Sequence, residues 1–268
     1  MARPPKVPAE VRCSIDGERT KIMMMMAMPA PEWVTVLGWV VTSVGVVLAG
    51  VILADIYVGG HRQPVPAMEA VWPITAIYAG PFALWAYYGW GRPATRKWQR
   101  QHGEPPRLGF PATVAVATIP GGAASMIGHA IAMPLVMWTG MTIAHQAVWP
   151  MILLIAAFAL PVLIVFEYHW LSRTGSAPTV GQRLRAASLI STLAILAFDV
   201  GMGASMLLVA FVLKYSGTSM ALWLIMWAGM WLGFATAYPV VWWWLKKDAT
   251  ASLSPAEITD TELVERAR

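Results

Sequence analysis

Six side chains between residues 129 and 230 have the chemistry and spacing of a site for a soft metal ion. One is a histidine and five are methionines: His129, Met133, Met202, Met206, Met226 and Met230. Thioether and neutral imidazole groups are both good ligands for Cu(I). Spacings of three, four or seven residues keep the groups of each segment near one helix face. The sequence therefore predicts a copper-type site, and the alternative is that these methionines are adaptable core side chains.

Asp199 lies near the middle of the uncharged stretch around it, about 13 residues from either end. A charged aspartate at the centre of a membrane helix costs at least ~3 kcal/mol. We therefore expect Asp199 to be neutral, paired or facing water. It is either a proton site or an acid that bonds to another helix, and an interhelical hydrogen bond is likewise the alternative role of His129.

Four further ionisable residues are expected at the outer surface: Asp55, His61, Glu69 and His145. They form either a polar vestibule, with Asp55 and Glu69 as intramembrane polar sites, or ordinary interface residues. Glu167 and His169 are expected to be solvated at the inner end of the fourth apolar stretch.

These residues are carried by six stretches long and apolar enough to cross a membrane: 34–54, 70–90, 111–141, 147–166, 186–213 and 219–245. Hydrophobic residues make up 57% of the chain and charged residues 12%, against about 25% charged in soluble proteins. A helix of about 20 apolar residues crosses the hydrocarbon core, and it bonds all its own amides there. The prediction is an all-α integral membrane bundle of six transmembrane helices.

The basic residues predict the orientation of this bundle. Of the 19 Lys and Arg residues, 17 fall in the N-terminal segment, the connections after the second and fourth stretches, and the C-terminal tail. Because cytoplasmic loops carry this excess, the N- and C-termini are predicted to be cytoplasmic and the membrane to be the plasma (inner) membrane. Lipid headgroups and topology account for the net charge of +5, so we expect the bilayer, and no nucleic acid, as partner.

The chain is expected to have three parts: a flexible cytoplasmic segment at 1–32, the transmembrane domain at 33–246, and a tail at 247–268. A short tail helix is predicted at Ser254, which caps Pro255 at the first helical position. The methionine run at 23–28 either captures Cu(I) or supplies start codons that compete with Met1.

Small residues predict close helix contacts at two places. Gly229 and Gly233 form a GxxxG pattern, and Ala124, Gly128 and Ala132 recur at every fourth position. Such faces let helix backbones approach each other. They are expected to pack within the bundle, and a contact between two copies of the chain is the alternative.

Two segments resemble a family of uncharacterised bacterial and archaeal polytopic membrane proteins, of the domain-of-unknown-function kind. The first runs from Asp55 to Pro64 and on through 71–93, and the second is 226–247. The likeness extends over most of 50–250. It implies a helical membrane fold and no particular chemistry.

Members of that family often carry a His-Cys…Cys cluster ahead of a Gly-Asp pair in the third span. In this chain Gly128 matches, but Pro120, Gly121 and Ser125 stand in place of His, Cys and Cys. His129 stands in place of the aspartate. The resemblance therefore implies no thiolate or metal role for these positions.

Transport or permeation of a small solute is the function that these residues indicate, with a soft metal ion such as copper, or a proton, as the solute. The alternative is a membrane interaction or assembly subunit that moves nothing. The sequence has no phosphate-binding glycine motif and no nucleophile elbow, so it does not indicate an enzyme.

Overall fold

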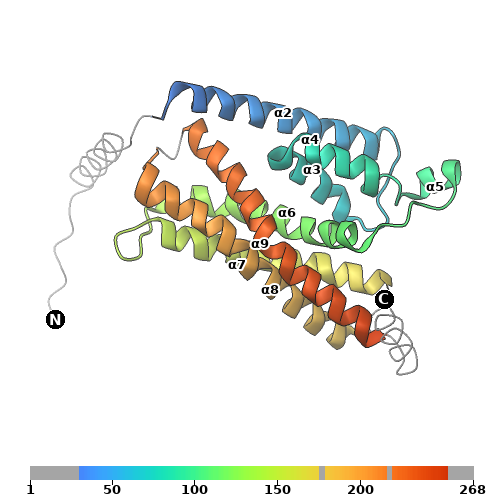
Figure 1. The fold of residues 1–268 in the computed structure, drawn as a ribbon. Helices are drawn as coiled ribbons and strands as arrows, with labels where there is room; N and C mark the ends of the chain where they lie inside the picture. The colour runs from blue at the N-terminus through green and yellow to red at the C-terminus, as the bar shows by residue number, and fades with distance from the viewer. Residues whose placement is uncertain (1–29, 175–178, 216–218, 253–268) are drawn as a thin grey trace, which may run out of the picture.

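The computed structural model describes residues 30–174, 179–215 and 219–252, and within them the chain forms a bundle of helices (Figure 1). Among these residues, five helices are long and apolar enough to cross a membrane. They are α2 (Glu32–Tyr57), α6 (Phe110–Thr139), α7 (Val148–Thr174), α8 (Val180–Leu207) and α9 (Met220–Ser252). The π-helix η2 (Leu208–Leu213) continues α8. The predicted all-α fold is therefore confirmed, but the second of the six predicted spans, 70–90, has a different structure.

The segment predicted as the second span is broken at Gly80. Helix α3 (Ala67–Ala79) ends there, and α4 (Pro81–Ala86) follows and continues as the π-helix η1 (Tyr87–Gly91). Gly80 has φ 55° and ψ −128°, a conformation that glycine adopts far more readily than other residues. Pro81 disfavours the helical conformation at Gly80 but suits the first position of the next helix. The Gly-Pro pair thus ends one helix and starts another.

Neither arm of this broken segment is long enough to cross a membrane. Helix α3 has 13 residues, and α4 and η1 have 6 and 5. At 1.5 Å per residue in an α-helix the arms are about 20 and 16 Å long, whereas the hydrocarbon core is about 30 Å thick.

Two close contacts show that the chain reverses direction between the two arms. Gly45, in the middle of α2, packs against the backbone of Ile77 near the end of α3. A Cβ at Gly91 would lie 2.6 Å from the ring of Trp72, near the start of α3. Residues 67–91 therefore enter and leave at the same end of the bundle, and we call them the re-entrant hairpin.

The remaining helices run so that the chain crosses the bundle five times. The starts of α2 and α9 lie together, because Gly38 packs against the backbone of Met220 and Trp227 Nε1 donates to Thr42 Oγ1 at 2.9 Å. The start of α2 and the end of α9 therefore lie at opposite ends of the bundle (Figure 1). The six-span prediction places them at the same end, and the re-entrant hairpin accounts for this difference.

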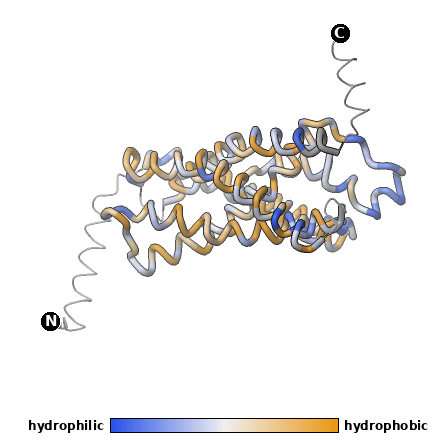
Figure 2. The backbone as a smooth tube through the Cα atoms, turned by 90° about the horizontal axis from the view of Figure 1, so that it is seen from below, coloured by the Kyte–Doolittle hydropathy of each residue, from blue (hydrophilic) through white to orange (hydrophobic). Residues whose placement is uncertain are grey.

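One end of the bundle, where α2 ends and α6 begins, holds most of the described cations, and we call it the basic end. The short helix α5 (Arg96–His102) lies there, in the connection between the hairpin and α6. Figure 2 shows this hydrophilic segment projecting from a bundle that is apolar along most of its length. At the opposite end, Lys214 is the only Lys or Arg among the described residues of the connections.

The small-residue faces pack inside the bundle. A Cβ at Gly229 of α9 would meet Ser205 of α8, and one at Gly128 of α6 would meet the backbone of Ile155 in α7. These faces therefore join α8 to α9 and α6 to α7. The predicted tail helix at 254 and the methionine run at 23–28 lie outside the described residues.

Candidate functional site

His129 is a buried histidine in the second half of α6, with 6% of its surface exposed. Its Nδ1 lies 2.8 Å from the carbonyl oxygen of Ser125, one turn earlier. A carbonyl oxygen only accepts, so a neutral His129 carries its hydrogen on Nδ1 and keeps the lone pair on Nε2. Nε2 is buried and has no hydrogen-bond partner in the described structure. Its lone pair is therefore available to accept a hydrogen bond, a proton or a metal ion.

A small space beside His129 brings several of the predicted site residues together. Helix α6 contributes His129, α7 contributes Ile152 and Ile155, and α8 contributes four residues: Asp199, Met202, Gly203 and Met206. The space does not admit a water molecule. Asp199 is half-buried. The structure thus places His129, Asp199 and two methionines around one small space, which we call the His129–Asp199 site.

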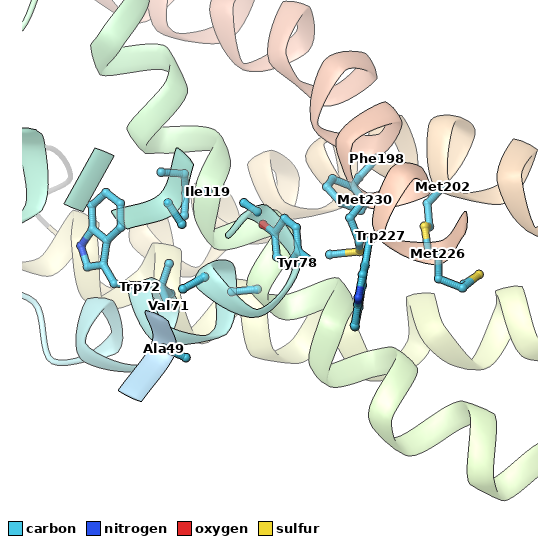
Figure 3. Close-up of a cluster of buried hydrophobic side chains, with 14 of the residues drawn as sticks. Ala49, Val71, Trp72, Tyr78, Ile119, Phe198, Met202, Met226, Trp227 and Met230 are labelled. Atoms are coloured by element: carbon cyan, nitrogen blue, oxygen red, sulfur yellow. The ribbon is translucent and has the colours of Figure 1, made fainter. Parts of the chain in front are cut away.

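The α9 methionines lie next to this site without lining it. Met226 and Met230 are both buried and belong to the same core cluster as Met202. Figure 3 shows Met202 and Met226 on neighbouring helices of this cluster, with Met230 beside Trp227. The sulfur of Met202 faces α9, since a Cβ at Gly229 would lie 2.8 Å from it. The site and α9 are thus separated by the side chain of Met202.

Met133 is partly buried and packs against this core cluster. It is absent from the lining of the His129–Asp199 site. Three of the six predicted soft ligands therefore share one space, and Met133, Met226 and Met230 lie outside it. Within the described residues, no three His, Cys, Asp or Glu residues gather into a possible metal site, so any metal site here depends on thioether ligands.

Asp55 lies in the last turn of α2 and holds three groups at the basic end. Its Oδ2 accepts a hydrogen bond of 2.7 Å from the hydroxyl of Tyr87 and lies 3.2 Å from Arg92 Nε. Its Oδ1 lies 3.1 Å from His61 Nδ1. A carboxylate whose oxygens are occupied in this way fastens the hairpin to α2.

Glu69 has a similar local role at the start of α3. Its Oε1 accepts from Arg62 Nε at 2.8 Å and from the backbone N–H of Gln63 at 3.2 Å. His145 is exposed in the connection between α6 and α7, at the opposite end of the bundle. The four residues expected at the outer surface are therefore divided between the two ends.

A larger cavity, of about 320 Å³, opens among α3, α6, α7, α8 and α9 toward the basic end. Its lining reaches Val65 and Leu108, in the two connections at that end. Glu167 of α7 is the only charged residue among the described residues of the lining, and we call this space the Glu167 cavity. Sequence reasoning expected Glu167 to be solvated. The sequence signal that could have marked Glu167 as a site residue is that it is the only acidic residue in the apolar helix α7.

The fold and these sites define the chain as a helical protein with five helices suited to a membrane, a re-entrant hairpin and ionisable groups inside the bundle. The family described as Domain of unknown function (DUF4396) matches residues 112–249, just over half of the chain, and the chain belongs to this family. The chain has no match among curated proteins or solved structures.

The matched range covers nearly all of α6, the whole of α7 and α8, and most of α9. It therefore includes the His129–Asp199 site and most walls of the Glu167 cavity. Helix α2 and the re-entrant hairpin precede the matched range. The resemblance to a domain-of-unknown-function family is confirmed, although the motif at 55–93 lies outside this match.

Proposed function

We propose that the protein moves a small solute across the plasma (inner) membrane, and that this solute is a soft cation such as Cu(I) or a proton. One observation carries the proposal: His129 and Asp199, on different helices, line one space inside the bundle together with two methionines. Ionisable groups at membrane depth are costly, and they commonly mark ion or proton pathways.

The donor set suits both cations. The free Nε2 of His129 and the thioether of Met206 are neutral ligands of the type that Cu(I) prefers. The sulfur of Met202 faces α9, so it becomes a third ligand only if its side chain turns toward the space. The carboxylate of Asp199 would offset the charge of the ion. For a proton, Asp199 and His129 are two groups that can bind it. Because the space admits no water, a metal ion enters only when the side chains or helices around it move.

We also propose that the basic end faces the cytoplasm. The described connections at this end carry the five basic residues of 92–107 and Arg62, whereas those at the opposite end carry Lys214. Short cytoplasmic loops carry such an excess of Lys and Arg. The start of α2 then lies on the outer side, which departs from the cytoplasmic N-terminus predicted from a count that included five Lys and Arg residues at 1–21. The Glu167 cavity opens toward the cytoplasm.

Flux into liposomes that contain the purified protein tests the transport proposal. Encapsulated bathocuproine disulfonate reports Cu(I) entry, and encapsulated pyranine reports proton entry. Met202→Leu removes a thioether at nearly constant volume, and Met126→Leu on α6 is the matched control, since Met126 lies outside the site lining. Asp199→Asn removes the carboxylate.

For a copper carrier, we expect wild-type and Met126→Leu liposomes to accumulate Cu(I), and Met202→Leu to slow entry at least tenfold. For a proton pathway, Asp199→Asn abolishes the pyranine response and Met202→Leu leaves it unchanged. If wild-type liposomes are no more permeable to either cation than protein-free liposomes, the transport proposal fails and an assembly subunit becomes the leading function.

A further inference from the structure

The Glu167 cavity has the charge and wall chemistry of a binding site for an organic cation. We propose that it binds a small monovalent amine or quaternary ammonium ion with apolar substituents. The proposal does not rest on transport through the His129–Asp199 site, because the two spaces share no lining residue.

The sign of the ligand's charge follows from the lining. Among the residues that the structure describes, Glu167 is the only charged residue of the lining, and no Lys, Arg or His belongs to it. The carboxylate of Glu167 has no hydrogen-bond or ion-pair partner in the part of the chain that the structure describes. The carboxylates of Asp55 and Glu69, by contrast, have partners within the chain. Among the described residues, Glu167 is therefore a carboxylate that can pair with a cation from outside the chain.

The apolar character of the ligand follows from the rest of the wall. Val71 of the hairpin, Leu163 of α7 and Val241 of α9 are among the aliphatic residues that line the cavity together with Glu167. A volume of about 320 Å³ is at the lower end of the usual range for small-molecule sites. A fully hydrated metal ion would bury little apolar surface here, whereas an alkyl or aryl ammonium ion would fill the space and gain from burial.

Aromatic rings and a helix carbonyl add to the preference for a cation. Phe166, Trp170 and Trp244 contribute to the lining, and the faces of such rings attract ammonium groups. Pro120 of α6 also lines the cavity and has no N–H to donate to the carbonyl of Val116, another lining residue. That carbonyl lacks its usual donor four residues later, so it remains an acceptor that favours positive charge.

The re-entrant hairpin forms part of the wall on the side of the basic end. Ala67, Met68 and Val71, all in the first two turns of α3, belong to the lining. The outgoing arm of the hairpin is anchored to α2 at this end through Asp55. Because one wall belongs to the hairpin and the others to the five-helix bundle, the hairpin's position sets the width of the cavity.

Equilibrium dialysis of radiolabelled benzyltrimethylammonium against the full-length protein in detergent tests the proposal. The variants are Glu167→Gln, which removes the charge, and Ala117→Leu, which fills part of the cavity and keeps the carboxylate. Glu104→Gln is the matched control, because Glu104 is exposed in the connection at the same end and outside the lining. Neopentylbenzene, in which carbon replaces the charged nitrogen, is the neutral competitor.

We expect saturable binding of one cation to the wild type and to Glu104→Gln. Glu167→Gln should weaken this binding at least tenfold, Ala117→Leu should weaken it as well, and the neutral competitor should displace the cation poorly. Absence of saturable binding to the wild type overturns the proposal, as does equal affinity in a folded Glu167→Gln variant. If that variant does not fold, Ala117→Leu decides, and unchanged binding to it overturns the proposal. Flux through the His129–Asp199 site does not enter this measurement, so the two proposals fail separately.

Discussion

The hydroxyl of Tyr87 donates a 2.7 Å hydrogen bond to Asp55 Oδ2, which ties the outgoing arm of the re-entrant hairpin to the last turn of α2. The same carboxylate oxygen lies 3.2 Å from Arg92 Nε. The hairpin needs such an anchor because neither arm spans the membrane. Removing the anchor is therefore expected to loosen the hairpin.

The change Tyr87→Phe tests this anchor. It removes the hydroxyl and keeps the ring, which is fully buried. We expect the free energy of unfolding to fall by about 1.5–3 kcal/mol, the usual contribution of a hydrogen bond to a charged group. Unfolding by sodium dodecyl sulfate in mixed micelles measures it. Tyr88→Phe is the control, because the Tyr88 hydroxyl has no hydrogen bond within the described residues. An equal loss of stability in both variants would contradict the prediction.

Gly80→Ala is expected to destabilise the hairpin at its tip. The positive φ of 55° at Gly80 strains any residue with a Cβ, at a cost of about 1–3 kcal/mol. Gly89→Ala is the matched control. It lies in η1 without a positive φ, and a Cβ there meets nothing within 4 Å. The same unfolding measurement should show a loss for Gly80→Ala and none for Gly89→Ala. If Gly80→Ala is as stable as the wild type, the chain does not turn at this residue as described.

The five long helices were predictable because apolar length is a local property of the sequence. The second stretch, 70–90, satisfies the same length criterion, so counting apolar residues made it a span. The signal against a single helix was the pair Gly80-Pro81. Whether the chain turns back after this pair depends on its contacts with α2, at Gly45 and Asp55. The sequence of the 70–90 stretch alone does not contain that information.

The candidate sites were predictable only in part for a similar reason. Helical spacing places Asp199, Met202 and Met206 near one face of α8, and the structure has them in one lining. That His129 of α6 meets this face, while Met133 does not, depends on how the helices rotate against each other. The enclosure of Glu167 likewise requires the hairpin, α8 and α9 to close around α7.

Asp199 should tolerate a neutral replacement better than a cationic one. Asp199→Asn keeps the shape and removes the charge, whereas Asp199→Lys puts a long cation beside a space that admits no water. A lysine at the helix centre costs at least about 2.5 kcal/mol. We expect near wild-type yield of monodisperse protein for the asparagine variant and a severalfold loss for the lysine variant. Glu104→Lys, at an exposed position, is the control for the charge change, and equal yields for both Asp199 variants would show that this position faces water.

Labelling of single cysteines distinguishes the re-entrant hairpin from a sixth span. In a Cys13→Ser background, the cysteines are introduced one at a time as Val58→Cys, Glu104→Cys and Thr142→Cys, all at exposed positions outside the helices. The structure places Val58 and Glu104 at the basic end and Thr142 at the opposite end. A membrane-impermeant maleimide should therefore label the first two from one side of oriented vesicles and the third from the other side. In the six-span arrangement, the cysteines at 58 and 142 would react from the same side and the cysteine at 104 from the other. Labelling in that pattern would contradict the re-entrant hairpin.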